Sequence, residues 1–123
     1  MDVPTFEKMV TEILEELPEE FATKIENVEF IVDPQPSTEI QKSMKVDSGT
    51  LLLGLYQGVP LPHRPKLDYS GVLPDRITIY QKNVEAVART EAKLREILRR
   101  TILHEIAHYF GISDRRLREL GVY

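Results

Sequence analysis

Residues 104–114 read His104-Glu105-Ile106-Ala107-His108-Tyr109-Phe110-Gly111-Ile112-Ser113-Asp114. In a helix, two histidines four residues apart lie one turn apart on the same face, so both imidazoles can bind one metal ion. Glu105 lies about 100° further around the helix than His104, beside the metal rather than as its natural third ligand. A carboxylate in this position can take a proton from a water that the metal activates. The pattern therefore predicts that Glu105 is the general base of a hydrolase.

The residues after His108 predict a third ligand. Gly111 can end the helix in a left-handed cap and turn the chain back. Asp114, six residues after His108, can then supply a carboxylate oxygen to the metal. Asp114 has a competing role as the N-cap of a last helix, where aspartate is also preferred. The alternative for the whole stretch is a buried helix end with core histidines, but it would leave the Glu105 carboxylate among apolar neighbours.

The composition excludes several kinds of site. At 123 residues the chain is expected to form one domain, residues 1–123, and its 41% hydrophobic and 29% charged content is typical of soluble globular proteins. The net charge of −4 gives no reason to expect nucleic acid as a partner. The absence of cysteine excludes disulfides and thiolate zinc sites, so any zinc must be bound by nitrogen and oxygen. With no signal peptide and no apolar run long enough for a membrane, we expect a cytoplasmic protein, monomeric or weakly oligomeric.

Apolar spacing predicts an amphipathic helix over residues 5–17, with Thr5 as its N-cap and Pro18 as its stop. Pro18 can also be the first residue of a short helix from Glu19 to about Lys24. One or two helical turns are expected within residues 37–44. A brief helix through Ala88 is expected to be capped by Asn83.

The longest helix is predicted from about Glu91 to Phe110, with Thr90 as its N-cap. Its first half is amphipathic and offers two favourable i,i+4 ion pairs, Glu91 with Arg95 and Glu96 with Arg100. Further along, apolar residues occupy the face that was charged before, so we expect the second half to be buried all round. The residues concerned are Leu103, Ile106 and Phe110. The segment 114–123, with Leu117, Leu120 and Val122, is expected to cover them.

Three segments predict strands: Val28 to Val32, Thr50 to Gln57 and Arg76 to Tyr80. Gly54 indicates a bulge or a point of close backbone approach in the second.

Two further segments leave alternatives open. Residues 58–74 contain four prolines and two glycines, and they form either a flap beside the site, holding His63, Arg64 and Tyr69, or an exposed connector. The basic residues Arg115, Arg116 and Arg118 either contact a phosphate or an acidic substrate end, or form a solvated helix face.

The chain resembles the minimal zincin-like metallopeptidases, a small bacterial family, in residues 53–61, 73–80 and 100–114. These segments read Leu53-Gly54-Leu55-Tyr56-Gln57-Gly58-Val59-Pro60-Leu61, Leu73-Pro74-Asp75-Arg76-Ile77-Thr78-Ile79-Tyr80 and Arg100-Thr101-Ile102-Leu103-His104-Glu105-Ile106-Ala107-His108-Tyr109-Phe110-Gly111-Ile112-Ser113-Asp114. The resemblance implies an α+β fold in which a small mixed sheet packs on N-terminal helices and on the long active-site helix, with a short C-terminal helix. It also implies that an extended substrate lies along the sheet edge.

On this chain the resemblance makes His104, His108 and Asp114 the ligands of one Zn²⁺ per chain and Glu105 the base. The motif is also similar to that of metzincins, which usually carry a third histidine at the position of Asp114 and a methionine turn after the motif. Here Met1, Met9 and Met44 all precede it.

These observations together predict a zinc-dependent metallopeptidase that acts on a peptide or protein substrate. The residues expected to contact substrate are Tyr80, His63, Tyr69 and Tyr109, and by residue type Tyr123 can also stabilise an oxyanion. One alternative is a non-catalytic zinc-binding module that holds peptides or proteins. Another is a metal-dependent ribonuclease, which Glu105 and the acidic net charge disfavour.

Overall fold

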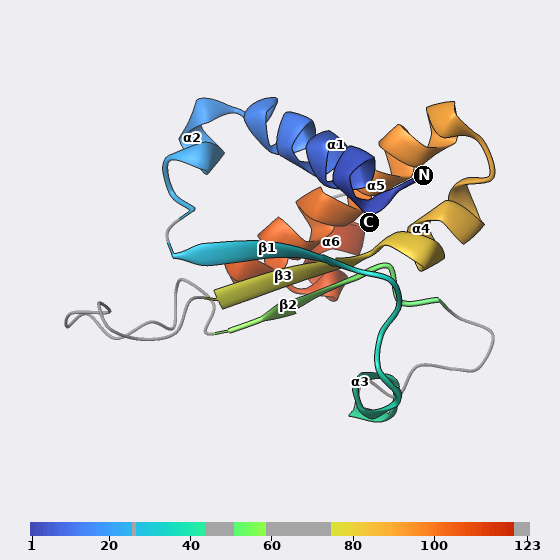
Figure 1. The fold of residues 1–123 in the computed structure, drawn as a ribbon. Helices are drawn as coiled ribbons and strands as arrows, with labels where there is room; N and C mark the ends of the chain where they lie inside the picture. Colours follow the sequence, from blue (N-terminus) through green and yellow to red (C-terminus); the bar gives the residue numbers. More distant parts are fainter. Residues whose placement is uncertain (26, 44–50, 59–74, 120–123) are drawn as a thin grey trace.

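The computed structural model describes residues 1–25, 27–43, 51–58 and 75–119, except the side chains of residues 20, 114, 117 and 118 (Figure 1). The elements in chain order are α1 (Val3–Glu15), α2 (Glu19–Ala22), β1 (Val28–Asp33), α3 (Thr38–Ser43), β2 (Gly54–Gln57), β3 (Asp75–Tyr80), α4 (Gln81–Ala88), α5 (Glu91–Tyr109) and α6 (Asp114–Glu119). This confirms the α+β architecture, the long helix that carries the histidines and the short helix after it.

The three strands form one mixed sheet with the order β1-β3-β2. The middle strand β3 pairs in parallel with β1 and antiparallel with β2, so that Ile77 lies between Phe30 and Tyr56. The second strand is shorter than predicted because only Gly54–Gln57 pair as a strand, although the Tyr80 amide still donates to the Leu53 carbonyl at 2.9 Å. Among the described strands β2 lies at an edge of the sheet, so one side of its backbone pairs with none of them.

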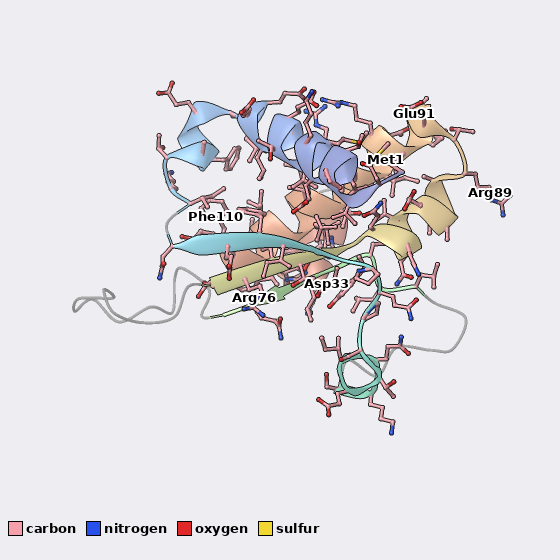
Figure 2. The ribbon with its side chains drawn as sticks, in the orientation of Figure 1. Met1, Asp33, Arg76, Arg89, Glu91 and Phe110 are labelled. Carbon is pink, nitrogen blue, oxygen red and sulfur yellow. The ribbon has the colours of Figure 1, made fainter. Side chains whose placement is uncertain are left out.

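The hydrophobic core lies between the sheet and a layer of helices. Figure 1 shows α1, α4 and α5 on one side of the sheet and α3 apart from it, and Figure 2 shows side chains filling the space between α1 and the strands. Ile77 and Ile79 point from β3 into this layer because alternate residues of a strand share a face. The helices contribute Phe6, Val10, Ile13, Val84, Ala88, Leu94, Leu98, Ile102 and Ile106.

Two of the predicted N-caps are wrong and one is confirmed. α1 is capped by Asp2, whose carboxylate accepts a hydrogen bond from the Thr5 amide at 2.8 Å. Pro18 was predicted as the first residue of α2, not as its cap, and it occupies the N-cap position instead. Asn83 lies inside α4, where its side-chain amide donates to the Leu52 carbonyl at 2.8 Å. Thr90 caps α5 as predicted and accepts from the amide three residues on, at 3.3 Å.

The outer face of α5 differs from the prediction at two positions. Leu103 is 41% exposed, so the helix is not buried all round, whereas Ile106 is buried. Residues 120 and 122, which were expected to cover Leu103, lie outside the described residues, and so does the side chain of residue 117. Arg95 pairs with Glu16, the C-cap residue of α1, at 2.8 Å rather than with Glu91 of its own helix. The predicted pair of Glu96 and Arg100 is present, at 3.6 Å.

Of residues 58–74, predicted to form a flap or a connector, all but Gly58 lie outside the described residues, and these include His63, Arg64 and Tyr69. Tyr123 lies outside them as well.

Candidate metal centre

His104, Glu105 and His108 lie together on the last two turns of α5. The two Nε2 atoms are 3.1 Å apart, and the ring planes meet at 70°. The nearest carboxylate oxygen of Glu105 lies 3.9 Å from Nε2 of His104. One ligand atom from each of the three residues lies within 4.8 Å of the others. Three groups that can bind a metal therefore converge within one small volume.

The separation of the imidazole nitrogens fits zinc. Two nitrogen ligands at about 2.05 Å from a tetrahedral zinc are about 3.3 Å apart. The 3.1 Å between Nε2 of His104 and Nε2 of His108 is close to this value. A direct hydrogen bond between the rings would need one nitrogen to donate and the other to accept, whereas a metal accepts a lone pair from both. The donor set of two imidazoles and a nearby carboxylate matches the hard and borderline ligands that zinc takes in the absence of cysteine.

The Glu105 side chain is held between α5 and the edge strand β2. Only 7% of Glu105 is exposed. A Cβ atom at Gly54 would lie 3.2 Å from Cγ of Glu105 and 3.0 Å from Cγ2 of Thr101. The absence of a side chain at Gly54 therefore allows the strand to approach the helix closely, which confirms the predicted close approach and leaves the Glu105 carboxylate little room to move.

The end of α5 positions His108. Gly111 has a φ of 82°, its amide donates to the His108 carbonyl at 2.9 Å, and the Ile112 amide donates to the Ala107 carbonyl at 2.9 Å. These two bonds form a Schellman motif, which confirms the left-handed cap predicted at Gly111. The chain then reverses into α6.

The start of α6 bears on the predicted third ligand. Ser113 caps this helix, because its hydroxyl oxygen accepts from the Arg116 amide at 3.2 Å. Asp114 is the first residue of the helix, so the N-cap role considered for it belongs to Ser113. The side chain of Asp114 lies outside the described part of the chain.

A buried polar contact supports the turn of α5 that carries His108. Tyr109 is fully buried, and its hydroxyl donates to the Lys24 carbonyl at 3.2 Å. Its ring meets that of Tyr56 edge to face, with centroids 6.1 Å apart. The Tyr56 hydroxyl donates in turn to the carboxylate of Asp75, which is 2% exposed, at 2.5 Å. No role for Tyr56 or Asp75 was predicted from the sequence. Tyr56 could have been identified, because it lies two residues after Gly54 and therefore on the same face of β2.

The predicted substrate contacts divide into two groups. His63 and Tyr69 lie outside the described residues. Tyr80 and Tyr109 are buried, so a substrate could reach either phenol only after a neighbouring segment moved. Burial, and then the negative charges of Asp33 and Glu105, raise the pKa of Tyr80, so its phenol stays neutral and can donate.

Comparison with known proteins gives one family. Residues 25–122 match the family model described as zincin-like metallopeptidase, which includes all three strands and the whole of α5. No curated protein matches the chain. Among the described residues, no helix has the length and apolar character that crossing a membrane requires.

Proposed function

Because the chain belongs to the zincin-like metallopeptidase family, we propose that it is a zinc-dependent peptidase in which His104 and His108 bind the metal. The observation that carries the proposal is the 3.1 Å separation of their Nε2 atoms, close to the spacing of two nitrogen ligands on one zinc. One zinc per chain is expected. The proposal takes residues 1–123 as one domain.

Asp114 is proposed as the third protein ligand. It is the first residue of α6 and follows the turn at Gly111 by three residues. Because Ser113 is the N-cap of α6, Asp114 is not needed in that role. Three protein ligands would leave one position of a tetrahedral zinc for water or substrate, as catalytic zinc sites require.

Glu105 is proposed as the general base. Zinc in such a site supplies Lewis acidity, which favours attack of water on a carbonyl. Glu105 accepts the proton that the attacking water loses, and it returns this proton to the amine that leaves when the C–N bond breaks. Its burial against Gly54 and the 3.9 Å between its carboxylate and Nε2 of His104 support this role, because they keep the carboxylate beside the proposed metal.

The test is the Glu105→Gln variant, assayed by mass spectrometry on a mixture of tryptic peptides with zinc present. We expect the variant to keep its zinc and to lose at least about a hundredfold in turnover, since general base catalysis contributes about 10²–10⁴-fold. Glu91→Gln, the same change at the exposed start of α5, is the control and should leave turnover unchanged. Undiminished turnover in Glu105→Gln would refute the assigned base.

The same experiment addresses the non-catalytic alternative. A wild-type chain that binds one zinc, retains peptides and cuts none would be a zinc-binding module that holds peptides or proteins. The family match runs against the ribonuclease alternative, because the match is to peptidases.

A further inference from the structure

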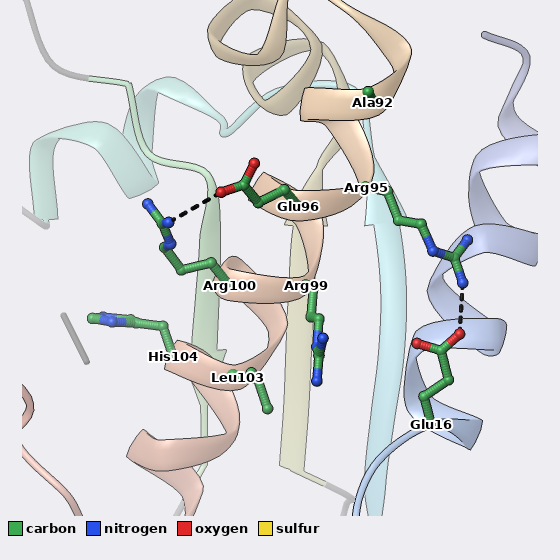
Figure 3. Close-up of a pocket in the computed structure, with 8 residues that line it drawn as sticks. All are labelled: Glu16, Ala92, Arg95, Glu96, Arg99, Arg100, Leu103 and His104. Carbon is green, nitrogen blue, oxygen red and sulfur yellow. Dashed lines mark hydrogen bonds and ion pairs between the residues drawn. The ribbon is translucent and has the colours of Figure 1, made fainter.

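A hollow of about 620 Å³ lies along the solvent-facing side of α5 and reaches His104 (Figure 3). Its walls come from α5 and, at one side, from the end of α1. The described residues that matter for its chemistry are Glu16, Arg95, Arg99, Arg100, Leu103 and His104. The hollow is therefore continuous with one of the two proposed zinc ligands.

The charges in the hollow are not balanced. Arg95 is engaged by Glu16 at 2.8 Å and by Glu12 at 3.8 Å, and Arg100 approaches Glu96 at 3.6 Å (Figure 3). Arg99 makes no ion pair with any residue that the structure describes. Its guanidinium is exposed at the surface, so it can bind a carboxylate without first breaking an internal pair.

An apolar side chain lies next to Arg99. Leu103 follows Arg99 by four residues, so the two side chains are neighbours on the helix surface, and Leu103 is 41% exposed. His104 follows Arg99 by five residues, which is about 7.5 Å along the helix axis and about 140° around it, and the two side chains point to different sides of α5 (Figure 3).

From these features we infer that the hollow binds an acidic side chain of the substrate, together with an apolar neighbour, at a place on α5 separate from the metal centre. Arg99 binds the carboxylate and Leu103 contacts the apolar residue. That the bound acidic peptide is a substrate rests on the proposed peptidase function, whereas the binding of an acidic peptide does not.

The test measures the binding of two fluorescein-labelled peptides to the Glu105→Gln chain, which prevents cleavage, by fluorescence anisotropy. One peptide repeats Glu-Leu and the other Gln-Leu. We expect the Glu-Leu peptide to bind more tightly, and Arg99→Gln to weaken it about threefold to fivefold, the effect of one exposed ion pair. Arg76→Gln is the matched control, because Arg76 is exposed on the side of the sheet away from α1 (Figure 2) and pairs only loosely with Glu29, at 3.7 Å.

A second variant is expected to bind the peptide more tightly. A gain in affinity cannot result from a variant that fails to fold. Glu16→Gln removes the carboxylate that engages Arg95 at 2.8 Å and leaves Arg95 the looser pair with Glu12 at 3.8 Å, so this second guanidinium can turn to the peptide more easily. We expect the Glu-Leu peptide to bind this variant more tightly than the parent chain.

Three results would overturn the inference. They are equal affinity for the two peptides, equal losses in Arg99→Gln and Arg76→Gln, and displacement of the peptide by a short polyuridine RNA that binds more tightly. Failure of the proposed function gives a different pattern, in which the Glu-Leu peptide binds through Arg99 but the wild-type chain cuts no peptide. Cleavage without any preference for acidic residues, and unaffected by Arg99→Gln, would overturn this inference alone.

Discussion

Replacing Gly54 with alanine tests whether β2 holds the Glu105 carboxylate in place. The new Cβ would lie 3.0 Å from Cγ2 of Thr101, 3.2 Å from Cγ of Glu105 and 3.2 Å from the Thr78 carbonyl oxygen. The Thr78 oxygen belongs to the backbone of the middle strand and cannot move alone. Thr101 is fixed because its hydroxyl donates to the Ile97 carbonyl at 2.8 Å. The side chain that must yield is therefore Glu105.

The expected magnitude follows from two opposing effects. Overpacking of this kind costs about 1–3 kcal/mol. The alanine also restricts the unfolded chain, which offsets about 0.4–1 kcal/mol. We expect a net loss of about 1–2 kcal/mol in the free energy of unfolding, or about 3–10 °C in Tm for a domain of this size. Turnover should fall further than zinc affinity does, because the three atoms nearest to the new Cβ belong to Thr101, Glu105 and Thr78 rather than to His104 or His108.

The assay combines urea unfolding with peptide hydrolysis for Gly54→Ala, Thr101→Ser and the double variant. Thr101→Ser removes the Cγ2 methyl that makes the closest contact, so the double variant should regain part of the lost stability. A Gly54→Ala chain with parental stability and turnover would refute the reasoning, because the Cβ would then fit without moving Glu105.

Three further predictions test the metal site and two supporting contacts. Zinc at about a hundred times its Kd should raise the free energy of unfolding by about 2.7 kcal/mol, and thermal unfolding should show no such gain in His104→Ala; an equal gain would remove His104 from the ligands. Tyr56→Phe takes the phenol away from buried Asp75 and should cost about 1–2 kcal/mol in urea unfolding; an unchanged midpoint would mean that this bond adds nothing. Hydrogen bonds from Thr5 hold the pKa of Asp2 below its usual 3.8, so the charged carboxylate stabilises the chain above that pH, and this contribution disappears as the pH falls through the lower pKa of the folded state. Asp2→Asn should therefore lose less stability than wild type below about pH 4, and superimposable acid-unfolding curves would contradict this.

Local signals predicted the ends of α5 correctly and those of α1 incorrectly. Thr90 and Gly111 act on the amides and carbonyls of their own turns, so nothing distant competes with them. At the start of α1, both Asp2 and Thr5 can cap a helix, and the proline between them fits the first turn, where its missing amide costs nothing. Asn83 failed as a cap because a carbonyl 31 residues away attracts its side chain.

The two histidines and the glutamate could be read from the sequence because all three lie on one helix, whose geometry relates them. The contacts that support these residues could not be predicted from the sequence. The packing of Tyr56 on Tyr109 and the hydrogen bond from Tyr56 to Asp75 depend on how strands pair across the sheet. The same limit applies to Leu103, whose exposure is set by what packs over α5. Gly54 was an intermediate case, because a glycine in a strand signals close approach but not which element approaches.

The position of α1 has a practical consequence for expressing this protein. The family match begins at residue 25, after α1, yet Phe6, Val10 and Ile13 belong to the same core cluster as Leu98 and Ile102 of α5. A fragment cut where the match begins would uncover aliphatic surface, at about 25 cal/mol for each Å². Such a fragment should self-associate. The matched stretch is therefore shorter than the segment whose side chains build the core cluster, and an expression fragment should begin before α1.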